Sequence, residues 1–259
     1  MPRRLVIKIG GSILGQHDTT LEDLAWLQST GVEAIVVHGG GKTITEWLDR
    51  QKVPTQFVNG LRVTDEASIG VVVAVLAGLI NKQLVATINA HGGRAVGLSG
   101  VDAGIVRAEI RDPALGLVGH PCHIHPDALE SLLREGFLPV LAPVGVLEKD
   151  GKLTDIMLNI NADAVAAAVG GGVHAQELLF FTDVPGVLGD DGQVMPSLGR
   201  DKAMALIASG VISGGMVPKV EACLQALGHM PSSQVLDGRQ PHALRDYVSG
   251  RRIGTTIAA

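Results

Sequence analysis

Lys8 lies where an ammonium group needs a partner. It is part of the aliphatic stretch VIKIGGS, residues 6–12, and burying an unpaired ammonium in such a strand would be costly. Gly10 and Gly11 follow it directly, and glycines let a backbone approach a ligand such as a phosphate closely. The pattern indicates that Lys8 binds an anion; the alternative is a solvated lysine on an edge strand.

Lys219 follows a second glycine-rich turn, in the segment SGGMVPK. A helix should begin there, because apolar residues recur after it at helical spacing: Val220, Cys223, Leu224 and Leu227. A lysine in the first turn opposes the helix dipole by roughly a few tenths of a kcal/mol. An anion in front of Lys219 would remove this cost, and the alternative is an exposed lysine that tolerates it.

A third glycine-rich turn spans residues 38–42, His-Gly-Gly-Gly-Lys, and opens a helix expected at Thr43. Free backbone N–H groups and the helix dipole favour an anion at such a place. The turn is not a Walker A motif, which requires a glycine five residues before Gly41, where Val36 stands. The chain also lacks G-x-G-x-x-G, so a dinucleotide-binding dehydrogenase loses its main support.

Arg62 lies in the segment NGLRVTD, in a turn between two structured segments. A planar guanidinium is suited to bidentate binding of a carboxylate. The alternative is a surface ion pair with the acidic residues that follow it.

The segment LNINAD, residues 158–163, leads into an alanine-rich helix. Alternation along a strand places Asn159, Asn161 and Asp163 on one side before the helix begins. Asn161 or Asp163 is also suited to be the N-cap, and the two roles are compatible.

Residues 119–125 resemble a metal site, because they include His120, Cys122, His123 and His125. In an extended strand, however, the first two side chains face one way and the last two face the other. The sequence therefore predicts no metal site in this segment.

Short β-branched runs alternate with helical patterns along the chain. Strands are expected at residues 5–9, 34–37, 95–98, 139–142 and 178–182, and helices at 20–28, 43–50 and 164–169. This alternation predicts an α/β fold in which a mainly parallel sheet is covered by helices on both faces, a three-layer αβα sandwich. Ligands in such folds bind at the carboxyl ends of the strands. One domain, residues 1–259, is expected, with a soft division near residue 175.

A helix expected at residues 67–91 is apolar around most of its circumference in its first half. It must be covered on more than one side, as a core helix or as a subunit interface. Its strongly apolar part, residues 69–80, is shorter than the roughly 20 residues that span a bilayer. The apolar start of the chain contains Lys8, which is unusual for a signal peptide. We expect no membrane partner.

The composition excludes several classes of protein. The net charge is −5, no dense basic tract occurs and aromatic residues make up 3%, so a nucleic-acid partner is not expected. The two cysteines, Cys122 and Cys223, are too few for a disulfide framework. A reducing compartment, the cytoplasm, is expected.

Eight segments together carry a family resemblance that covers the whole chain. In order they are VIKIGGS, VHGGGK, NGLRVTD, VGLSGVDAG, NINADAVA, FFTDVPGVL, GGMVPKVEA and GTTI. This set resembles the amino acid kinase family. The resemblance implies an enzyme that uses ATP and Mg²⁺ to phosphorylate the side-chain carboxylate of N-acetyl-L-glutamate in arginine biosynthesis.

The resemblance also implies roles for individual residues. Lys8 and Lys219 would bind the transferring phosphoryl group from opposite sides, and Asp163 would hold both ammonium groups. Residues 1–174 would form the acceptor-substrate lobe, with Gly40, Gly41, Arg62, Asn159 and Asn161 as substrate-binding residues. Residues 175–259 would form the nucleotide lobe, and the nucleotide-binding residues would be Gly10, Gly11, Ser12, Thr182, Asp183, Gly186, Gly214 and Gly215.

Two other functions are compatible with parts of the sequence. A kinase for carrier-protein-bound aminoadipate or glutamate would need a basic docking surface, and no clear Lys/Arg cluster lies near Arg62 in the sequence. A non-catalytic sensor of ATP and an amino acid would not need Lys8, Asp163 and Lys219, all of which are present.

The resemblance also bears on assembly and regulation. Arginine-inhibited members of the family carry a helix before the first strand, whereas here only residues 1–4 precede Leu5. We therefore expect a homodimer built on the helix at 67–91 that arginine does not inhibit. The histidine-rich segment 120–125 is unusual in what the family uses as a substrate-covering hairpin.

Overall fold

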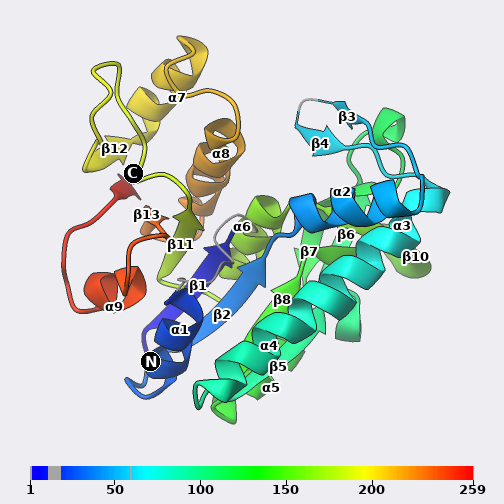
Figure 1. The fold of residues 1–259 in the computed structure, drawn as a ribbon, viewed down its shortest axis with the longest axis horizontal. Coiled ribbons are helices and arrows are strands. Elements are labelled where there is room, and N and C mark those ends of the chain that lie inside the picture. The colour runs from blue at the N-terminus through cyan, green and yellow to red at the C-terminus, as the bar shows by residue number, and fades with distance from the viewer. Residues whose placement is uncertain (1, 11–18, 59, 259) are drawn as a thin grey trace.

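A twisted eight-stranded sheet forms the centre of the molecule (Figure 1). The computed structural model describes residues 2–10, 19–58 and 60–258. Across the sheet the strands lie in the order β12 (Ser197–Gly199), β14 (Thr255–Ala258), β13 (Ser232–Asp237), β11 (Glu177–Thr182), β1 (Arg4–Ile9), β2 (Glu33–His38), β8 (Leu138–Ala142) and β5 (Ala95–Ser99). All neighbours are parallel except β13 and β14. The predicted mainly parallel sheet is confirmed.

Helices cover both faces of this sheet. One face packs against α1 (Thr20–Gln28), α2 (Gly41–Arg50), α9 (Ala243–Val248) and a long helix made of α3 (Glu66–Val73), the π-helical segment η1 (Ala74–Ile80) and α4 (Asn81–Ala90). The other packs against α5 (Asp127–Arg134), α6 (Ala162–Gly172), α7 (Arg200–Ala208) and α8 (Met216–Ala226). Alternation along β1 serves both: Leu5, Ile7 and Ile9 join the first core and Val6 the second. The three-layer sandwich is confirmed.

A small closed barrel lies beyond the carboxyl end of β8. Its strands are β6 (Val106–Ile110), β7 (Val118–Ile124), β9 (Val144–Lys149) and β10 (Lys152–Ile160). The 3₁₀ turns η2 (Asp102–Gly104) and η3 (Pro113–Leu115) lie on either side of β6 in the sequence. A short hairpin of β3 (Phe57–Val58) and β4 (Leu61–Arg62) precedes α3. The barrel is connected to the main sheet's helical layer because β10 leads directly into α6.

The long helix from α3 to α4 buries one stripe of its surface against α1, α2, β5 and β8. The most apolar 18-residue window within Glu66–Ala90 has a mean hydropathy of 2.0, and 39% of that window is buried. By length and composition alone this helix could cross a membrane, a property that core helices of soluble proteins share. The rest of its apolar surface is the part that the expected subunit interface would use.

The packing of Gly254, next to β14, can be tested against Gly31, because both glycines have left-handed backbones. Gly254 has φ +71°, and a Cβ there would overlap the backbone carbonyl of Val235; Gly31 has φ +77° and open space around it. Gly31→Ala should cost about 1 kcal/mol of unfolding free energy from backbone strain alone. Gly254→Ala should cost about 3 kcal/mol or more, because fixed backbone atoms cannot move aside. Urea unfolding measures both, and equal losses would contradict this account.

Candidate active site

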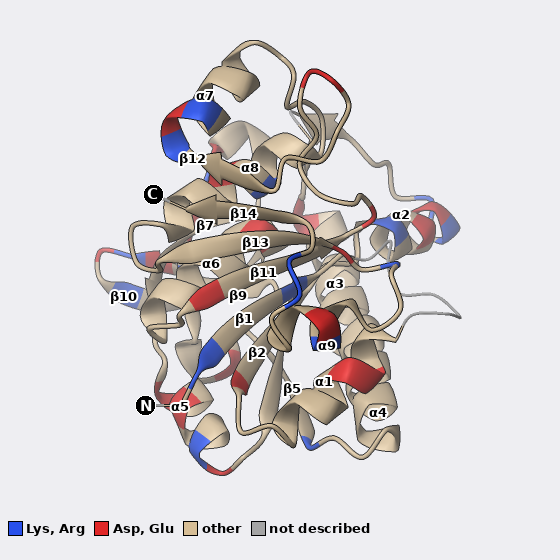
Figure 2. Ribbon diagram, turned by 90° about the vertical axis from the view of Figure 1, so that its left-hand side faces the viewer, with Lys and Arg blue, Asp and Glu red and all other residues tan. Residues whose placement is uncertain are grey.

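Charged side chains lie mainly on helices and loops, and on the face in Figure 2 the Lys and Arg residues are spread over several elements. Within the described part of the chain, five charged side chains are buried: Lys8, Asp23, Arg62, Asp163 and Asp237. Two of these, Lys8 and Asp163, contact each other, and Arg62 is a third predicted site residue. Because buried charges need partners, Lys8, Asp163 and Arg62 mark the candidate site.

Lys8, Asp163 and Lys219 converge on the α6 and α8 face of the sheet. Lys8 lies two residues after Val6 in β1, so its side chain points to the same face. Its Nζ is 2.8 Å from Asp163 Oδ1, and Lys219 Nζ is 3.8 Å from Asp163 Oδ2. One carboxylate in the first turn of α6 therefore lies between two ammonium groups, and the first turn of a helix favours a negative charge.

The electrostatics of this group favour a further anion. Burial lowers the pKa of Lys219; the carboxylate of Asp163 acts to raise it and the ammonium of Lys8 to lower it. The Lys219 side chain retains 19% exposure, against 8% for Lys8. Two ammonium groups share one carboxylate here, and an anion arriving from the solvent side of Lys219 would balance the excess charge.

The glycine turn after β2 is held against the sheet and the long helix. Gly39 N–H donates to Ile9 O at 3.0 Å. A Cβ at Gly40 would overlap the side chains of Leu76 and Ile80, whereas one at Gly41 would meet no atom within 4 Å. Gly40 therefore packs closely against these two side chains, and the backbone at Gly41 has open space beside it.

A buried polar network supports this turn, and the sequence analysis gave it no role. His38 Nδ1 lies 3.0 Å from Gly39 O, and its Nε2 lies 3.2 Å from Asn81 Nδ2. Asn81 Nδ2 also donates to Val140 O at 2.8 Å, and Lys82 Nζ donates to Asn81 Oδ1. Burial lowers the pKa of His38 to about 4. The sequence signal was an asparagine that ends the apolar run of the long helix.

Arg62 lies at the edge of the site with its guanidinium firmly held. Its Nη2 donates to Gly41 O at 2.9 Å and to Thr45 Oγ1 at 2.7 Å, and its Cζ lies 4.7 Å from the centre of the Phe57 ring. Burial lowers the pKa of Arg62. Asp65 instead caps α3 by accepting from Ser68 N–H. The alternative of an exposed arginine paired with the next acidic residues is not what the structure has.

The two asparagines of β10 and α6 have different local partners. Asn159 Nδ2 donates to Thr64 Oγ1 at 3.0 Å, and Thr64 Oγ1 donates to Arg62 O, so Asn159 and Arg62 belong to one cluster. Asn161 is the N-cap of α6, and its Oδ1 accepts from Asp163 N–H at 2.8 Å. The capping alternative for Asn161 is confirmed, and Asn161 also lines the main cleft.

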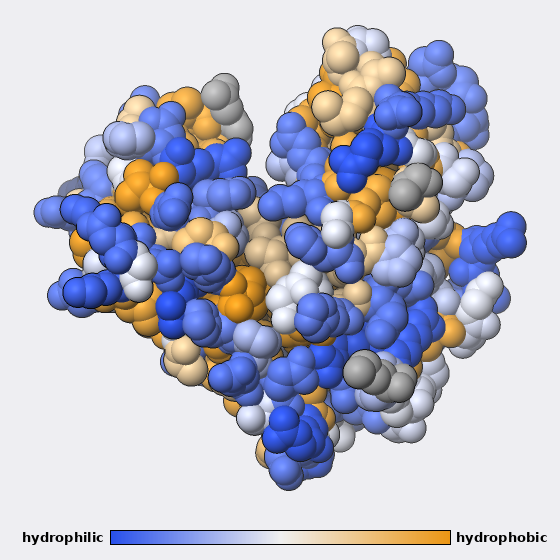
Figure 3. Space-filling model, turned by 180° about the vertical axis from the view of Figure 1, so that it is seen from behind, coloured by the Kyte–Doolittle hydropathy of each residue, from blue (hydrophilic) through white to orange (hydrophobic). Residues whose placement is uncertain are grey.

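This cleft has a volume of about 810 Å³ and lies between the β3–β4 hairpin and the starts of α6 and α8. Figure 3 shows the molecule hollowed between its two upper lobes. Asn161, Gly214 and Gly215 line the cleft, and a Cβ at either glycine would meet no atom within 4 Å. Arg111 and Glu221, which were not predicted as site residues, also line it. Arg111 belongs to no motif that the sequence reveals, and Glu221 lies in the segment GGMVPKVEA without a predicted role.

Most of the other predicted nucleotide-binding residues lie at the carboxyl end of β11. Thr182 ends β11 and its Oγ1 donates to Asp183 Oδ1 at 3.2 Å. The charge of Asp183 acts on Lys219. Gly10 N–H donates to Phe181 O, which places Gly10 beside Thr182. Gly186 packs instead against Thr255 and Val194 of the β12–β14 region.

Gly11 and Ser12 lie outside the described residues. The structure therefore brings together Lys8, Asp163 and Lys219 in one group, and Gly41, Arg62 and Asn159 in a second, with Gly214 and Gly215 on the cleft wall. The roles assigned to these residues stay predictions.

Comparison with known proteins agrees with the geometry. The model of the amino acid kinase family matches residues 3–236. The chain is 45% identical over 273 residues to acetylglutamate kinase of Gluconobacter oxydans, covering 98% of this chain and 91% of that protein. It is 39% identical over 254 residues to acetylglutamate kinase of Dehalococcoides mccartyi, covering 98% and 93%. The crystal structure of smu.665 from Streptococcus mutans superposes with a TM-score of 0.82 at 29% identity, covering 99% and 98%.

Proposed function

The chain belongs to the amino acid kinase family, and from this premise we propose that it is an acetylglutamate kinase. It transfers the γ-phosphoryl group of ATP to the side-chain carboxylate of N-acetyl-L-glutamate, in arginine biosynthesis. The products are ADP and an acyl phosphate. Full-length similarity to acetylglutamate kinases supports this substrate.

One observation carries the chemistry: the carboxylate of Asp163 holds the ammonium groups of Lys8 and Lys219 close together. A phosphoryl group in transfer carries charge on its equatorial oxygens, and fixed cations stabilise that charge without reorganisation. Asp163 keeps the two lysines from separating. Each lysine should contribute on the order of 10²–10³ in rate.

The acceptor needs no general base. A carboxylate is ionised at neutral pH, so the attacking oxygen carries no proton that must be removed. Catalysis then depends on positioning and charge stabilisation. The backbone N–H groups of Gly40 and Gly41 at the start of α2 are suited to bind phosphoryl oxygens.

The acceptor is positioned by its non-reacting end. Arg62 offers a planar guanidinium for the α-carboxylate, and Asn159 offers an amide for the acetamido group. Their link through Thr64 supports a joint role, because it fixes the two groups relative to each other.

The nucleotide is assigned to the lobe formed by residues 175–259. Gly214 and Gly215 open α8 onto the cleft, which fits a polyphosphate at a helix N-terminus. Thr182, Asp183 and Gly10 lie at the ends of neighbouring strands, whereas Gly186 packs against Thr255 and Val194. Mg²⁺ enters bound to ATP and neutralises phosphate charge.

We assign the enzyme to the cytoplasm and to a homodimer. The dimer would use the part of the long helix that the sheet leaves uncovered, where Ile69 and Leu79 are half-buried apolar residues. Their apolar surface is what a second copy would bury. Light scattering tests the assembly.

The function itself is tested by trapping the product. The purified chain is incubated with ATP, Mg²⁺ and hydroxylamine in three separate reactions. Each reaction contains one acceptor: N-acetyl-glutamate, N-acetyl-aspartate or free glutamate. Hydroxylamine converts an acyl phosphate to a hydroxamate, and we expect hydroxamate with N-acetyl-glutamate only. Preferential reaction of another acceptor would overturn the proposal.

Lys8→Ala and Lys219→Ala should each lower kcat by about 10²-fold or more, because each removes charge stabilisation made mainly in the transition state. Lys8→Arg should not restore the rate, since a forked guanidinium does not replace a compact ammonium in a buried strand. Steady-state kinetics measure the loss, and circular dichroism checks the fold. A near-normal kcat in Lys219→Ala would remove that residue from the site.

Arg62→Lys should raise the KM for the acceptor with a smaller change in kcat. The substitution loses a bidentate contact to a part of the substrate that does not react. The KM for ATP, measured in the same assay, serves as the internal control. If only the KM for ATP rises, the assignment of Arg62 to the acceptor is wrong.

A further inference from the structure

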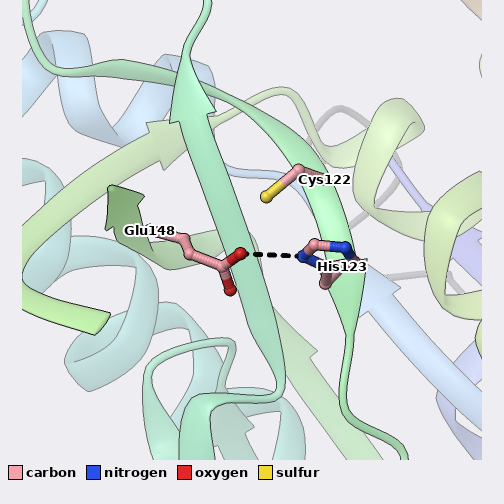
Figure 4. A group of neighbouring side chains, drawn as sticks. All are labelled: Cys122, His123 and Glu148. Atoms are coloured by element: carbon pink, nitrogen blue, oxygen red, sulfur yellow. Dashed lines mark hydrogen bonds and ion pairs between the residues drawn. The ribbon is translucent and has the colours of Figure 1, made fainter. Parts of the chain in front are cut away.

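Cys122, His123 and Glu148 form a cluster of metal-ligating side chains outside the candidate active site (Figure 4). One ligand atom of each lies within 4.8 Å of the other two. His123 Nδ1 is 3.0 Å from Glu148 Oε1. Cys122 and His123 belong to β7 and Glu148 to β9, and β6 lies between these strands in the barrel.

A β-bulge brings Cys122 and His123 to the same side of β7. The register with β6 shifts between the pairs Arg107–His123 and Ala108–Pro121, so Cys122 is an extra residue in the strand. A bulge interrupts the alternation of side chains. The alternation expected from the sequence therefore fails at these two residues, and Figure 4 shows both side chains directed toward Glu148.

The three donors are those of a zinc-type site. Thiolate, imidazole and carboxylate bind Zn²⁺ at about 2.0–2.3 Å in tetrahedral geometry, and three protein ligands leave one position for water. Side chains already this close need only small rotations to share one ion. Harder ions such as Mg²⁺ prefer an all-oxygen set, which this cluster does not offer.

Arg107 supports the cluster from β6. Its Nη1 donates to Glu148 Oε2 at 3.2 Å, which leaves Oε1 facing His123. Such outer contacts orient a ligating carboxylate.

We propose that Cys122, His123 and Glu148 bind one divalent transition-metal ion, for which Zn²⁺ is the best match. The metal–sulfur bond forms as the Cys122 thiol releases its proton to solvent. The ion would join β7 to β9 across β6 and so stiffen the barrel whose fourth strand, β10, carries Asn159.

Co²⁺ is the probe, because its absorption reports both a sulfur ligand and tetrahedral geometry. We expect the metal-free full chain to bind one Co²⁺ with a thiolate-to-cobalt charge-transfer band. Excess Zn²⁺ should abolish the band and raise the unfolding temperature, because an ion that binds only the folded chain stabilises it. Absence of the band in the wild-type chain would refute the site.

Three variants and one matched control localise the ion. Cys122→Ser should abolish the band, and His123→Ala and Glu148→Gln should each weaken Zn²⁺ binding at least about tenfold. His125 lies two residues after His123 and outside the cluster, so His125→Ala should leave the charge-transfer band and the Zn²⁺ affinity unchanged. A band that persists in Cys122→Ser would place the sulfur ligand at Cys223 and overturn the assignment.

A separate observation concerns the buried pair of His38 and Asn81 beneath the glycine turn. The carbonyl oxygen of Gly39 can only accept, so His38 Nδ1 carries the proton and Nε2 accepts from Asn81 Nδ2. The geometry points to these two as positioning residues that fix Gly39–Gly41 against the long helix. Asn81 directly follows the π-helical segment, whose residues Leu76 and Ile80 contact Gly40.

This assignment rests on the proposed function, and its readout is the split between kcat and KM. His38→Leu and Asn81→Leu should each lower kcat about tenfold with little change in either KM, because a small displacement of the turn misaligns the phosphoryl group. The losses should not multiply in the double variant, since both residues act on the turn through the hydrogen bond that Asn81 Nδ2 donates to His38 Nε2. His38→Gln, which retains an acceptor for Asn81, should recover part of the rate.

Asn89→Leu is the matched control. Asn89 ties the same helix to β5 through hydrogen bonds to Ala95, far along the helix from the turn. It should lower stability and leave kcat unchanged. Unchanged kcat in His38→Leu, or losses that multiply in the double variant, would refute the positioning role; a wild-type chain that forms no acyl phosphate would instead refute the proposed function.

Discussion

The candidate site depends on one buried carboxylate that is shared by two ammonium groups. Lys8 lies in β1, a central strand of the sheet, where an unpaired charge could not be solvated, so α6 must present Asp163 to it. Lys219, in the first turn of α8, reaches the other oxygen of the same carboxylate. Three elements far apart in the sequence are therefore linked by a single group. Asn161 serves this arrangement as the N-cap of α6, since it holds the backbone of Asp163 in place.

The parallel sheet explains why the remaining site residues gather where they do. The strands β1, β2, β8 and β11 all end at one edge, so the turns that follow them meet there. Close packing then sets the shape of each turn. Gly40 is pressed against the long helix and Gly41 faces open space, which divides the glycine turn into a part that anchors and a part that can bind.

The sequence predicted those parts of the fold whose signals are local. Helix α1 has the predicted bounds, and β1, β2, β5, β8 and β11 agree to within a residue at each end, because their hydrophobic patterns are long and regular. The barrel was not predicted, since its closure depends on pairings distant in sequence and on bulged strands such as β7. Single residues were equally ambiguous. The aliphatic neighbours of Lys8 indicated an anion partner but were also compatible with a solvated lysine on an edge strand, and only packing shows Lys8 and Arg62 to be buried. The contact between His38 and Asn81 was not predicted, because it joins residues 43 positions apart.

The distances from the Asp163 carboxylate to the Nζ atoms of Lys8 and Lys219 differ, so one lysine is held more tightly than the other. Lys8 Nζ lies 2.8 Å from the carboxylate and is almost fully buried, whereas Lys219 Nζ lies 3.8 Å away with its side chain 19% exposed. Lys8 and Asp163 therefore form the fixed half of the group, set by the sheet and α6. Lys219 is the less constrained member, on the helix that begins at the cleft. An anion bound between the lysines would compensate the burial that lowers the pKa of Lys219, and so stabilise the ammonium form that the transfer requires.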